Sequence, residues 1–473
     1  MSDAAAGEYQ SLQQRERAVL ANRHFLNLWL AQLLAQVAQN AVLFTLLVLV
    51  LTRTNSTTDT SILVLSYVVP ALLFGMVAGV FVDRWRKRDI FIATNAFRAL
   101  AAVAFLLSKD HVEFLFAINI IFSAAGQFFA TAEVATVPSL VPKSQLIAAN
   151  SLVSLAWTGA QFTGMVFFAP IMLKTFGTDA LFIATALFFV AATILTRSLP
   201  VTVGAQTADE NGERRIPQTA PRELWQAMRI LRSDPDALLA MAQLTLSSSL
   251  VLLFAVLVPR FMQEVLDVRP EDAVYIFAPT GVGAILGLRM LPWLARKIGK
   301  DKVVAYGLLG LTGCLVALGL VQNIADLLQK TEDFNPFGPQ RLGGLSLLVA
   351  LTMVFAGPLG LTYAMVNAPA QTVLHERAPP EMRGRVFGAQ MALASLAAIV
   401  PLLLVGAVAD IYGVSFVLFA IAVVVAALAG LSLHVLDRQQ KARMMVSPKP
   451  SSEPVERQSG AGSASIDTGE GVG

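Results

Sequence analysis

The sequence predicts an all-α polytopic membrane protein with twelve transmembrane helices in two pseudo-symmetric six-helix halves. Of its 473 residues, 55% are hydrophobic and only 14% are charged, too few polar side chains to cover a soluble protein of this size. The charges fall between long apolar runs, because a charged side chain at the bilayer centre is costly. The runs are continuous, whereas the strands of a membrane β-barrel alternate between apolar and polar residues.

Twelve apolar runs are long enough to cross a bilayer core about 30 Å thick, which needs roughly 20 helical residues. Nine runs carry no charge, and three carry one internal charge each, namely Arg98, Glu133 and Arg289. In chain order, we expect the helices within residues 24–52, 60–82, 89–108, 114–142, 144–173, 180–196, 237–259, 273–295, 303–325, 342–374, 386–409 and 411–436.

A polar stretch divides the twelve runs into two groups of six. We expect a cytoplasmic N-terminal segment, an N-terminal bundle, a linker with an interfacial helix, a C-terminal bundle and a disordered cytoplasmic tail, over residues 1–22, 23–199, 200–236, 237–437 and 438–473. Within the linker, Pro221–Ser233 has apolar residues on one helical face and arginines elsewhere, as an interfacial helix does. The end of the chain is rich in Ser, Gly and Pro, a composition typical of disorder.

The positive charges predict the orientation. Most of the 35 Lys and Arg residues lie at the two termini and in the loops after helices 2, 4, 6, 8 and 10, and cytoplasmic segments retain positive charge. We therefore expect both termini in the cytoplasm, a bacterial inner-membrane location, and a monomer surrounded by lipid. The basic residues form no patch, which argues against a nucleic-acid partner.

The composition disfavours metal, redox and ATP-driven chemistry. Cys314 is the only cysteine and the four histidines are scattered, so we expect no metal site and no cofactor. No phosphate-binding Gly-x-x-x-x-Gly-Lys-Ser/Thr loop occurs. Gly283-Ala-Ile-Leu-Gly287 lies inside a span and repeats the pattern Gly75-Met-Val-Ala-Gly79 of the first half, which indicates close helix packing. A membrane enzyme would need a nucleophile or paired acids, and only His375-Glu376 is a candidate.

The most specific motif lies between the second and third runs, at Gly79-Val-Phe-Val-Asp83-Arg84-Trp85-Arg86-Lys87-Arg88. It resembles the Gly-x-x-x-Asp-Arg-x-x-Arg-Arg signature of the major facilitator superfamily, in the loop where that family carries it. The resemblance implies the major facilitator fold and a gating role for Gly79, Asp83, Arg84 and Arg88, with Asp83 near the start of helix 11 at Arg383, Gly384 and Arg385. The alternative is that the basic residues only fix the topology.

Shorter motifs resemble one branch of that family, which contains enterobactin exporters, macrolide efflux pumps and lysophospholipid transporters. They are Asn22-Arg-His-Phe-Leu-Asn-Leu-Trp-Leu30, Asn95-Ala-Phe-Arg98, Ala149-Asn150-Ser-Leu152 and Arg383-Gly-Arg-Val386. Two departures from the family pattern are Arg86, where many relatives have glycine, and Gln39-Asn40, near which some carry an aspartate. The second departure weakens the case for proton or cation coupling through helix 1.

Arg98 and Glu133 are the two charges within helices of the first half. We expect them to form an intramembrane charge pair, since pairing offsets the cost of burial. Two interpretations stay open. The pair is a structural brace, which we favour, or Glu133 is a protonatable coupling site.

Uncharged polar residues recur at helical spacing and predict a substrate cavity. Resemblance to the family places helices 1, 4, 7 and 10 around a central cavity, and most of the polar stripes fall on these helices. Single members could equally hold helices together by hydrogen bonds. The predicted cavity residues are Gln32, Gln36, Gln39, Asn40, Asn119, Ser123, Gln127, Trp157, Gln161, Gln243, Ser247, Tyr363, Asn367 and Gln371.

The sequence thus predicts a non-enzymatic secondary transporter that works by alternating access. An aromatic and amide-lined cavity without a central charge favours export of an amphipathic or largely apolar small molecule, such as a drug-like compound or siderophore, with proton antiport as one driving force. The alternatives are a lipid or lysophospholipid flippase without ion coupling and a polytopic membrane enzyme. Related transporters carry unrelated molecules, so the fold does not decide among these functions.

Overall fold

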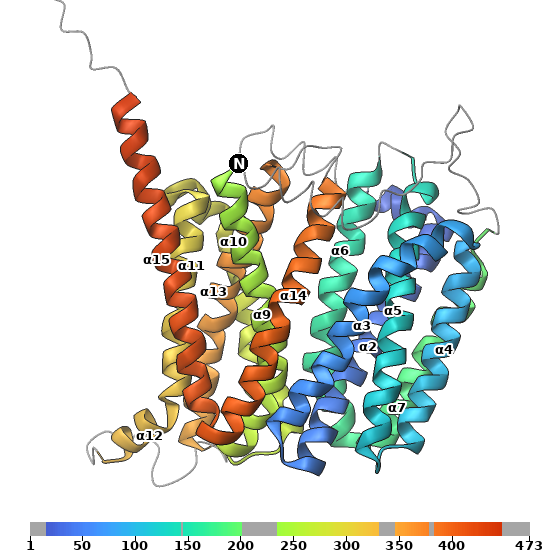
Figure 1. The fold of residues 1–473 in the computed structure, drawn as a ribbon, viewed down its shortest axis with the longest axis horizontal. Helices are drawn as coiled ribbons and strands as arrows, with labels where there is room; N and C mark the ends of the chain where they lie inside the picture. Colours follow the sequence, from blue (N-terminus) through green and yellow to red (C-terminus); the bar gives the residue numbers. More distant parts are fainter. Residues whose placement is uncertain (1–15, 143–144, 201–233, 331–345, 378–382, 447–473) are drawn as a thin grey trace, which may run out of the picture.

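The computed structural model describes residues 16–142, 145–200, 234–330, 346–377 and 383–446. Within these ranges the chain is helical apart from short connections and contains no strand. Figure 1 shows long helices standing side by side in two groups, with the chain running up and down between two faces. The helices of the first group are α2 (Arg23–Thr54), α3 (Thr57–Arg84), α4 (Lys87–Leu107), α5 (Val112–Leu140), α6 (Leu146–Phe162) and α7 (Ala169–Arg197), with the π-helix η2 (Thr163–Phe168) joining the last two.

The second group repeats this arrangement with six long helices and two short ones. The short elements are the 3₁₀ turn η3 and helix α12, which projects sideways from the bundle in Figure 1. In chain order, the elements are α9 (Pro235–Glu264), η3 (Pro270–Asp272), α10 (Ala273–Ile298), α11 (Lys300–Gly319), α12 (Val321–Lys330), α13 (Leu347–Arg377), α14 (Arg383–Tyr412) and α15 (Val414–Val446).

The predicted fold class is confirmed. Eleven helical segments of the described chain are long and apolar enough to span a membrane, and one of them, Ala148–Arg197, has 50 residues. A straight helix of that length would measure about 75 Å, more than twice the bilayer core. Gly177, with φ of 80° and ψ of 177°, breaks the helix there, so this segment accounts for two crossings and the described residues for twelve.

Polar caps and prolines set the ends and bends of these helices. Asn22 accepts hydrogen bonds from the backbone N–H groups of His24 and Phe25 at the start of α2, and its Nδ2 donates to the carbonyl of Leu140 at the end of α5. Such a cap satisfies N–H groups that a helix leaves unpaired. Prolines lie inside α3, α5, α9, α10, α13 and α14, which membrane helices tolerate when neighbours satisfy the freed carbonyls.

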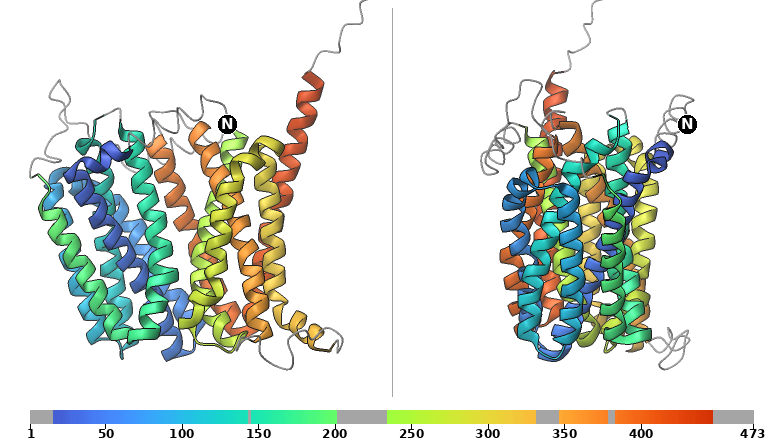
Figure 2. Two further views of the ribbon diagram at one scale, coloured as in Figure 1. Left: turned by 180° about the vertical axis from the view of Figure 1, so that it is seen from behind. Right: turned by 90° about the vertical axis from the view of Figure 1, so that its right-hand side faces the viewer.

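The two ends of the described chain lie on one side of the molecule. The start of α2 and the end of α15 are at the same side in Figures 1 and 2, as an even number of crossings requires. We call this side the terminal face, and the opposite side, which carries α12, the far face. Large apolar side chains point outward between the faces, for example Leu100 (69% exposed) and Val423 (69% exposed), as a lipid-facing surface requires.

The last helix extends beyond the expected boundary of the C-terminal bundle. Helix α15 continues to Val446, although the tail was expected to be disordered from residue 438. Residues 438–446 contain no Gly or Pro, and Arg, Gln, Lys, Ala and Met are good helix formers, so nothing local ends the helix before Pro448. The interfacial helix expected at 221–233 and the tail from 447 onward lie outside the described residues.

Close packing of α10 against α13 explains one of the two glycine patterns. A methyl group at Gly283 would lie 1.9 Å from the carbonyl oxygen of Gly357, and one at Gly287 would lie 2.8 Å from that of Leu361. These glycines therefore let two backbones touch. A methyl group at Gly79 would meet no atom within 4 Å, so its expected role in close helix approach does not hold in this conformation.

Candidate functional site

A polar latch at the far face joins the two halves. The carboxylate of Asp410, near the end of α14, accepts hydrogen bonds from the backbone N–H of Thr57 (2.7 Å) and of Thr58 (2.9 Å) and from the Thr58 hydroxyl (2.7 Å). Thr57 and Thr58 are the first residues of α3, whose exposed N–H groups carry partial positive charge. Asp410 thus acts as an anionic cap, supplied by one half to a helix of the other.

Two further contacts extend the latch. Nη1 of Arg260 on α9 donates to Oδ1 of Asn55 (2.8 Å), and Nε of Arg260 donates to the carboxylate of Glu264 (3.1 Å). Asn55 ends α2 in the left-handed conformation with φ of 50°, and Asn tolerates this conformation better than most residues. Lys174 on α7 pairs with Asp272 of η3. We call the contacts of Asp410, Arg260 and Lys174 across the halves the far-face latch.

Tight helix packing accompanies the latch. A methyl group at Gly406 on α14 would lie 2.4 Å from Ser61 Oγ and 2.9 Å from the Thr57 carbonyl oxygen on α3. Ser61 is fully buried. A side chain larger than hydrogen at position 406 would therefore separate the halves at this face.

The described hydrogen bonds and ion pairs that cross between the halves all belong to this latch. The other described polar contacts stay within one half, including Lys300 to Glu376 and Arg377 to Asp234 at the terminal face. The halves are therefore held together by polar contacts at one face, among the side chains that the structure describes.

The loop motif lies at the terminal face. Lys87 Nζ donates to the Ala135 carbonyl (3.2 Å), and Arg88 Nη1 donates to the Leu199 carbonyl (3.4 Å), so both tie helices within the first half. Arg84 is exposed. The end of α3 and the start of α14, which carries Arg383–Arg385, reach the same face. The side chains of Asp83 and of residues 383–385 are outside the described part, so the expected gate contact stays a prediction.

A buried polar network lies inside the first half. Arg98 on α4 is 1% exposed, and its guanidinium donates to Oε1 of Gln39 (3.1 Å) and to Oδ1 of Asn95 (2.6 Å). Gln39 in turn donates to the hydroxyl of Tyr67 (2.6 Å). The Arg98 guanidinium carbon lies 4.9 Å from each of two phenylalanine ring centres, Phe129 and Phe189. Amides and aromatic faces thus compensate the buried cation.

Glu133 on α5 lies near this network but makes different contacts. It is 1% exposed, the indole of Trp157 on α6 faces its carboxylate, and its Oε1 has no hydrogen-bond partner among the described residues. Arg98 attracts Glu133 through space, yet no ion pair joins these two described side chains. The structure therefore brings the expected charge pair into one core, while the hydrogen bonds of Arg98 go to amides.

The predicted cavity residues separate into two groups. Asn119 and Ser123 bond to α3, and Gln243 bonds to Ser432 (3.1 Å), so these three hold helices together within a half. The buried group comprises Gln32, Gln36, Gln39, Asn119, Ser123, Gln243 and Ser247. The partly or fully exposed group comprises Asn40, Gln127, Trp157, Gln161, Tyr363, Asn367 and Gln371.

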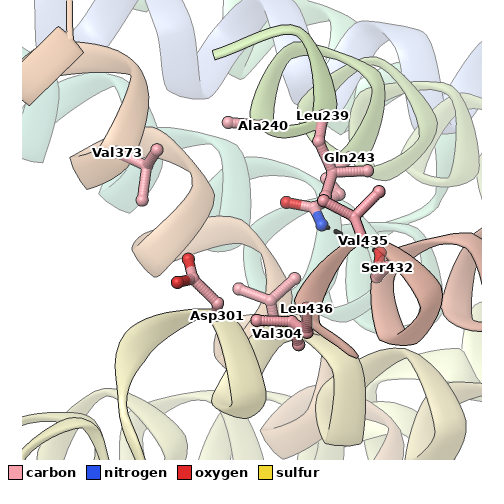
Figure 3. A pocket seen from close by; sticks show the side chains of 9 residues that line it. All are labelled: Leu239, Ala240, Gln243, Asp301, Val304, Val373, Ser432, Val435 and Leu436. Carbon is pink, nitrogen blue, oxygen red and sulfur yellow. Dashed lines mark hydrogen bonds between the residues drawn. The ribbon is translucent and has the colours of Figure 1, made fainter. Parts of the chain in front are cut away.

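Gln243 also lines a small pocket within the second half. Figure 3 shows its side chain pointing toward Ser432, with Asp301 and Val373 on the opposite wall. The cavity volume is about 20 Å³, room for a water molecule but far less than a drug-sized ligand requires. This pocket is too small to be a substrate site.

Sequence reasoning missed the far-face latch. Asp410 is the single charge between the last two apolar runs, and in one dimension it only marks a span boundary. Its partners are more than 350 positions away in the chain. The sequence contained an acidic residue at the end of one helix and a Ser-Thr-Thr start of another. Only the packing of α3 against α14 shows that these two helix ends meet.

Comparison with known proteins agrees with this architecture. The chain is 23% identical over 363 residues to the uncharacterized MFS-type transporter YfiS of Bacillus subtilis, covering 76% of this chain and 79% of YfiS. It is 23% identical over 390 residues to the uncharacterized MFS-type transporter Rv0037c of Mycobacterium tuberculosis, covering 78% and 80% of the two chains. Among solved structures, the nucleoside transporter NupG superposes with a TM-score of 0.65 at 13% identity, covering 87% of this chain and 99% of NupG.

A family model identifies the protein more directly than any single relative. Residues 28–331 match the model of the Major Facilitator Superfamily, a span that begins in α2 and covers more than half of the chain. Twelve crossings, two six-helix halves and the loop motif after α3 agree with that match. This protein therefore belongs to the major facilitator superfamily of membrane transporters.

Proposed function

We propose that this protein is a secondary transporter that exports an amphipathic or largely apolar small molecule by alternating access. The observation that carries the proposal is that the polar contacts between the halves, among the described side chains, gather at the far face. Contacts confined to one face let two rigid halves rock about the membrane centre, so that breaking the latch opens one side while the other closes.

Two exposed side chains on α6 support the substrate class. Trp157 is 41% exposed and Gln161, one turn further along α6, is also exposed. Helix α6 continues into η2, which packs against α10 of the other half. An indole face and an amide suit a molecule with a large apolar part and a few polar groups. Such substrates include drug-like compounds and siderophores.

Location and driving force complete the proposal. The bias of Lys and Arg toward the terminal face supports a cytoplasmic terminal face in a bacterial inner membrane. The far-face latch would then close the outer side, and the conformation described here would face the cytoplasm, ready to receive a substrate for export. We further propose that the protein acts as a monomer and that inward movement of protons drives the cycle.

Accumulation of fluorescent probes in cells tests the proposal. Ethidium, Nile red and a fluorescent lysophospholipid are followed in cells with and without the protein, before and after a protonophore collapses the gradient. Lower accumulation of ethidium or Nile red that disappears with the gradient is the expected result. Gradient-independent movement of the lysophospholipid alone would instead identify a lipid flippase, and an unchanged signal for all three probes would contradict the proposed substrate class.

A reversible lock links the transport signal to alternating access. Thr58→Cys and Asp410→Cys are combined in a Cys314→Ala background, so that oxidation joins α3 to α14. Oxidation is expected to stop export and reduction to restore it, while the two single-cysteine variants do not respond to oxidation. Export that continues with the halves joined would contradict the rocking mechanism.

A further inference from the structure

We propose that Glu133 is the proton-binding residue of this transporter and that Trp157 connects its protonation to the substrate pathway. The inference rests on the proposed function for its role in export, but the proton site itself is defined by buried contacts in the first half. The proton site is separate from the loop motif and from the far-face latch.

Glu133 is a buried carboxylate, and no described cation is bound to it. Its exposure is 1% and its Oε1 has no hydrogen-bond partner, whereas buried carboxylates are ordinarily paired or fully hydrogen-bonded. A carboxylate in this position changes its proton occupancy when the polarity around it changes. Opening and closing of the halves provides such a change, because water reaches different parts of the interior in the two states.

The charged and titratable groups around Glu133 do not neutralise it directly. On α4, the guanidinium of Arg98 is engaged by Gln39 and Asn95, and Lys87 donates to the carbonyl of Ala135, two residues after Glu133 on α5. On α3, the Tyr67 hydroxyl is engaged by Gln39. From α6, the indole of Trp157 faces the carboxylate. Arg98 therefore attracts Glu133 without fixing it in an ion pair, which would hold it permanently ionised.

The amide of Gln32 on α2 is a second buried polar group without a hydrogen-bond partner, and the packing of α2 against α5 places it near the level of Glu133. Oε1 of Gln39 lies 3.2 Å from where a methyl group at Gly126 would be. Glu133 lies two helical turns from Gly126 toward the terminal face, and Gln32 lies two turns from Gln39 in the same direction. Gln32 is fully buried, and neither atom of its amide group has a partner. An amide at this level can donate to an ionised carboxylate or accept from a protonated one.

Trp157 is the residue that couples proton binding at Glu133 to substrate binding. One part of the indole faces the buried carboxylate, while 41% of the residue is exposed. When a proton moves from water to Oε1 of Glu133, the carboxylate loses its negative charge and the indole N–H loses its anionic acceptor. The ring is then no longer held in the orientation that exposes it to the substrate pathway, and a bound apolar molecule is released. When the proton returns to water, the N–H is drawn back and the ring again presents its exposed part to a substrate. Proton and substrate thereby compete through one side chain.

Infrared spectroscopy of the full-length protein in lipid nanodiscs tests the proton site without any substrate. A protonated carboxylic acid has a carbonyl absorption that an ionised carboxylate lacks. The wild-type protein is expected to show one buried carboxylic acid band that titrates with pH. Glu133→Gln should lose the band, and Glu113→Gln, an exposed carboxylate on the same helix, should keep it. A band that persists unchanged in Glu133→Gln would overturn the assignment.

Coupling is tested by adding Trp157→Phe, which removes the indole N–H and keeps an aromatic ring. The midpoint of the Glu133 titration should shift in this variant, whereas an unchanged midpoint would refute the role of Trp157. In the ethidium assay, Glu133→Gln should lose the response to the proton gradient while the folded protein remains in the membrane, and a wild-type response would refute coupling. If no probe is exported, the proposed function fails, yet the infrared titration still decides the proton site.

Discussion

Removing the carboxylate of Asp410 should shift the protein toward the state in which the far face is open. Asp410→Ala deletes two hydrogen bonds from backbone N–H groups at the start of α3 and two from the Ser56 and Thr58 hydroxyls. Loss of a helix N-cap costs about 0.5–2 kcal/mol. Because Asp410 is partly exposed and water replaces some of its bonds, we expect the closed state to lose about 1–2 kcal/mol. That loss raises the open population about 5- to 30-fold.

A buried reporter cysteine measures this population. Ser61 is fully buried beside Gly406 when the far face is closed, so Ser61→Cys in a Cys314→Ala background reacts with a hydrophilic maleimide only when the face opens. In nanodiscs, the labelling rate should rise in Asp410→Ala by the same factor as the open population. Asp410→Asn keeps one acceptor oxygen and should give an intermediate rate.

The matched control is Asp59→Asn. Asp59 is in the first turn of the same helix, but it makes no described bond to α14, so its replacement removes a charge near the same helix N-terminus without touching the latch. Its labelling rate should stay within about twofold of the parent, since helix-dipole effects are typically below about 1 kcal/mol. Equal rates for Asp410→Ala and the parent would refute the reasoning that this carboxylate holds the halves together.

Three further predictions concern packing, the loop motif and topology. Gly360→Ala would place a methyl group 1.8 Å from a backbone carbonyl oxygen of α10. The overpacking costs about 1–3 kcal/mol and should lower the thermal unfolding midpoint, whereas Gly79→Ala should leave that midpoint unchanged. Equal midpoints for the two variants would contradict the packing analysis. Asp83→Asn should depress transport with membrane insertion intact, and unchanged transport would remove Asp83 from the gate. Cysteines at Thr178 and Lys143 should be labelled by impermeant reagents from outside and inside respectively, and the reverse pattern would overturn the proposed orientation.

Much of the fold could be predicted from the sequence because the bilayer imposes simple rules. Spans must be long and apolar, so the spacing of charges together with the length of the apolar runs predicts the twelve crossings. The family match agrees with the loop motif at Gly79–Arg88. Glycine spacing at Gly283 and Gly287 predicted close packing, which occurs against α13. The same spacing misled at Gly79, because spacing does not say which helix lies opposite.

The functional details depended on partners distant in the chain. The polar stripes on helices 1 and 4 were visible as stripes, but only packing decided that Gln39 joins Arg98 to Tyr67 and that Asn119 and Ser123 bond to α3. Spacing also placed Arg98 and Glu133 in one half without deciding which groups each would contact.

The sequence by itself determined that this chain crosses a membrane twelve times in two halves, since each crossing is a local property of hydrophobicity and length. Tertiary structure alone decided that Asp410 caps α3 and that the described polar contacts between the halves lie at one face. The physical reason is that a hydrogen bond depends on two groups meeting in space, and hydropathy along a chain contains no information on which helices become neighbours.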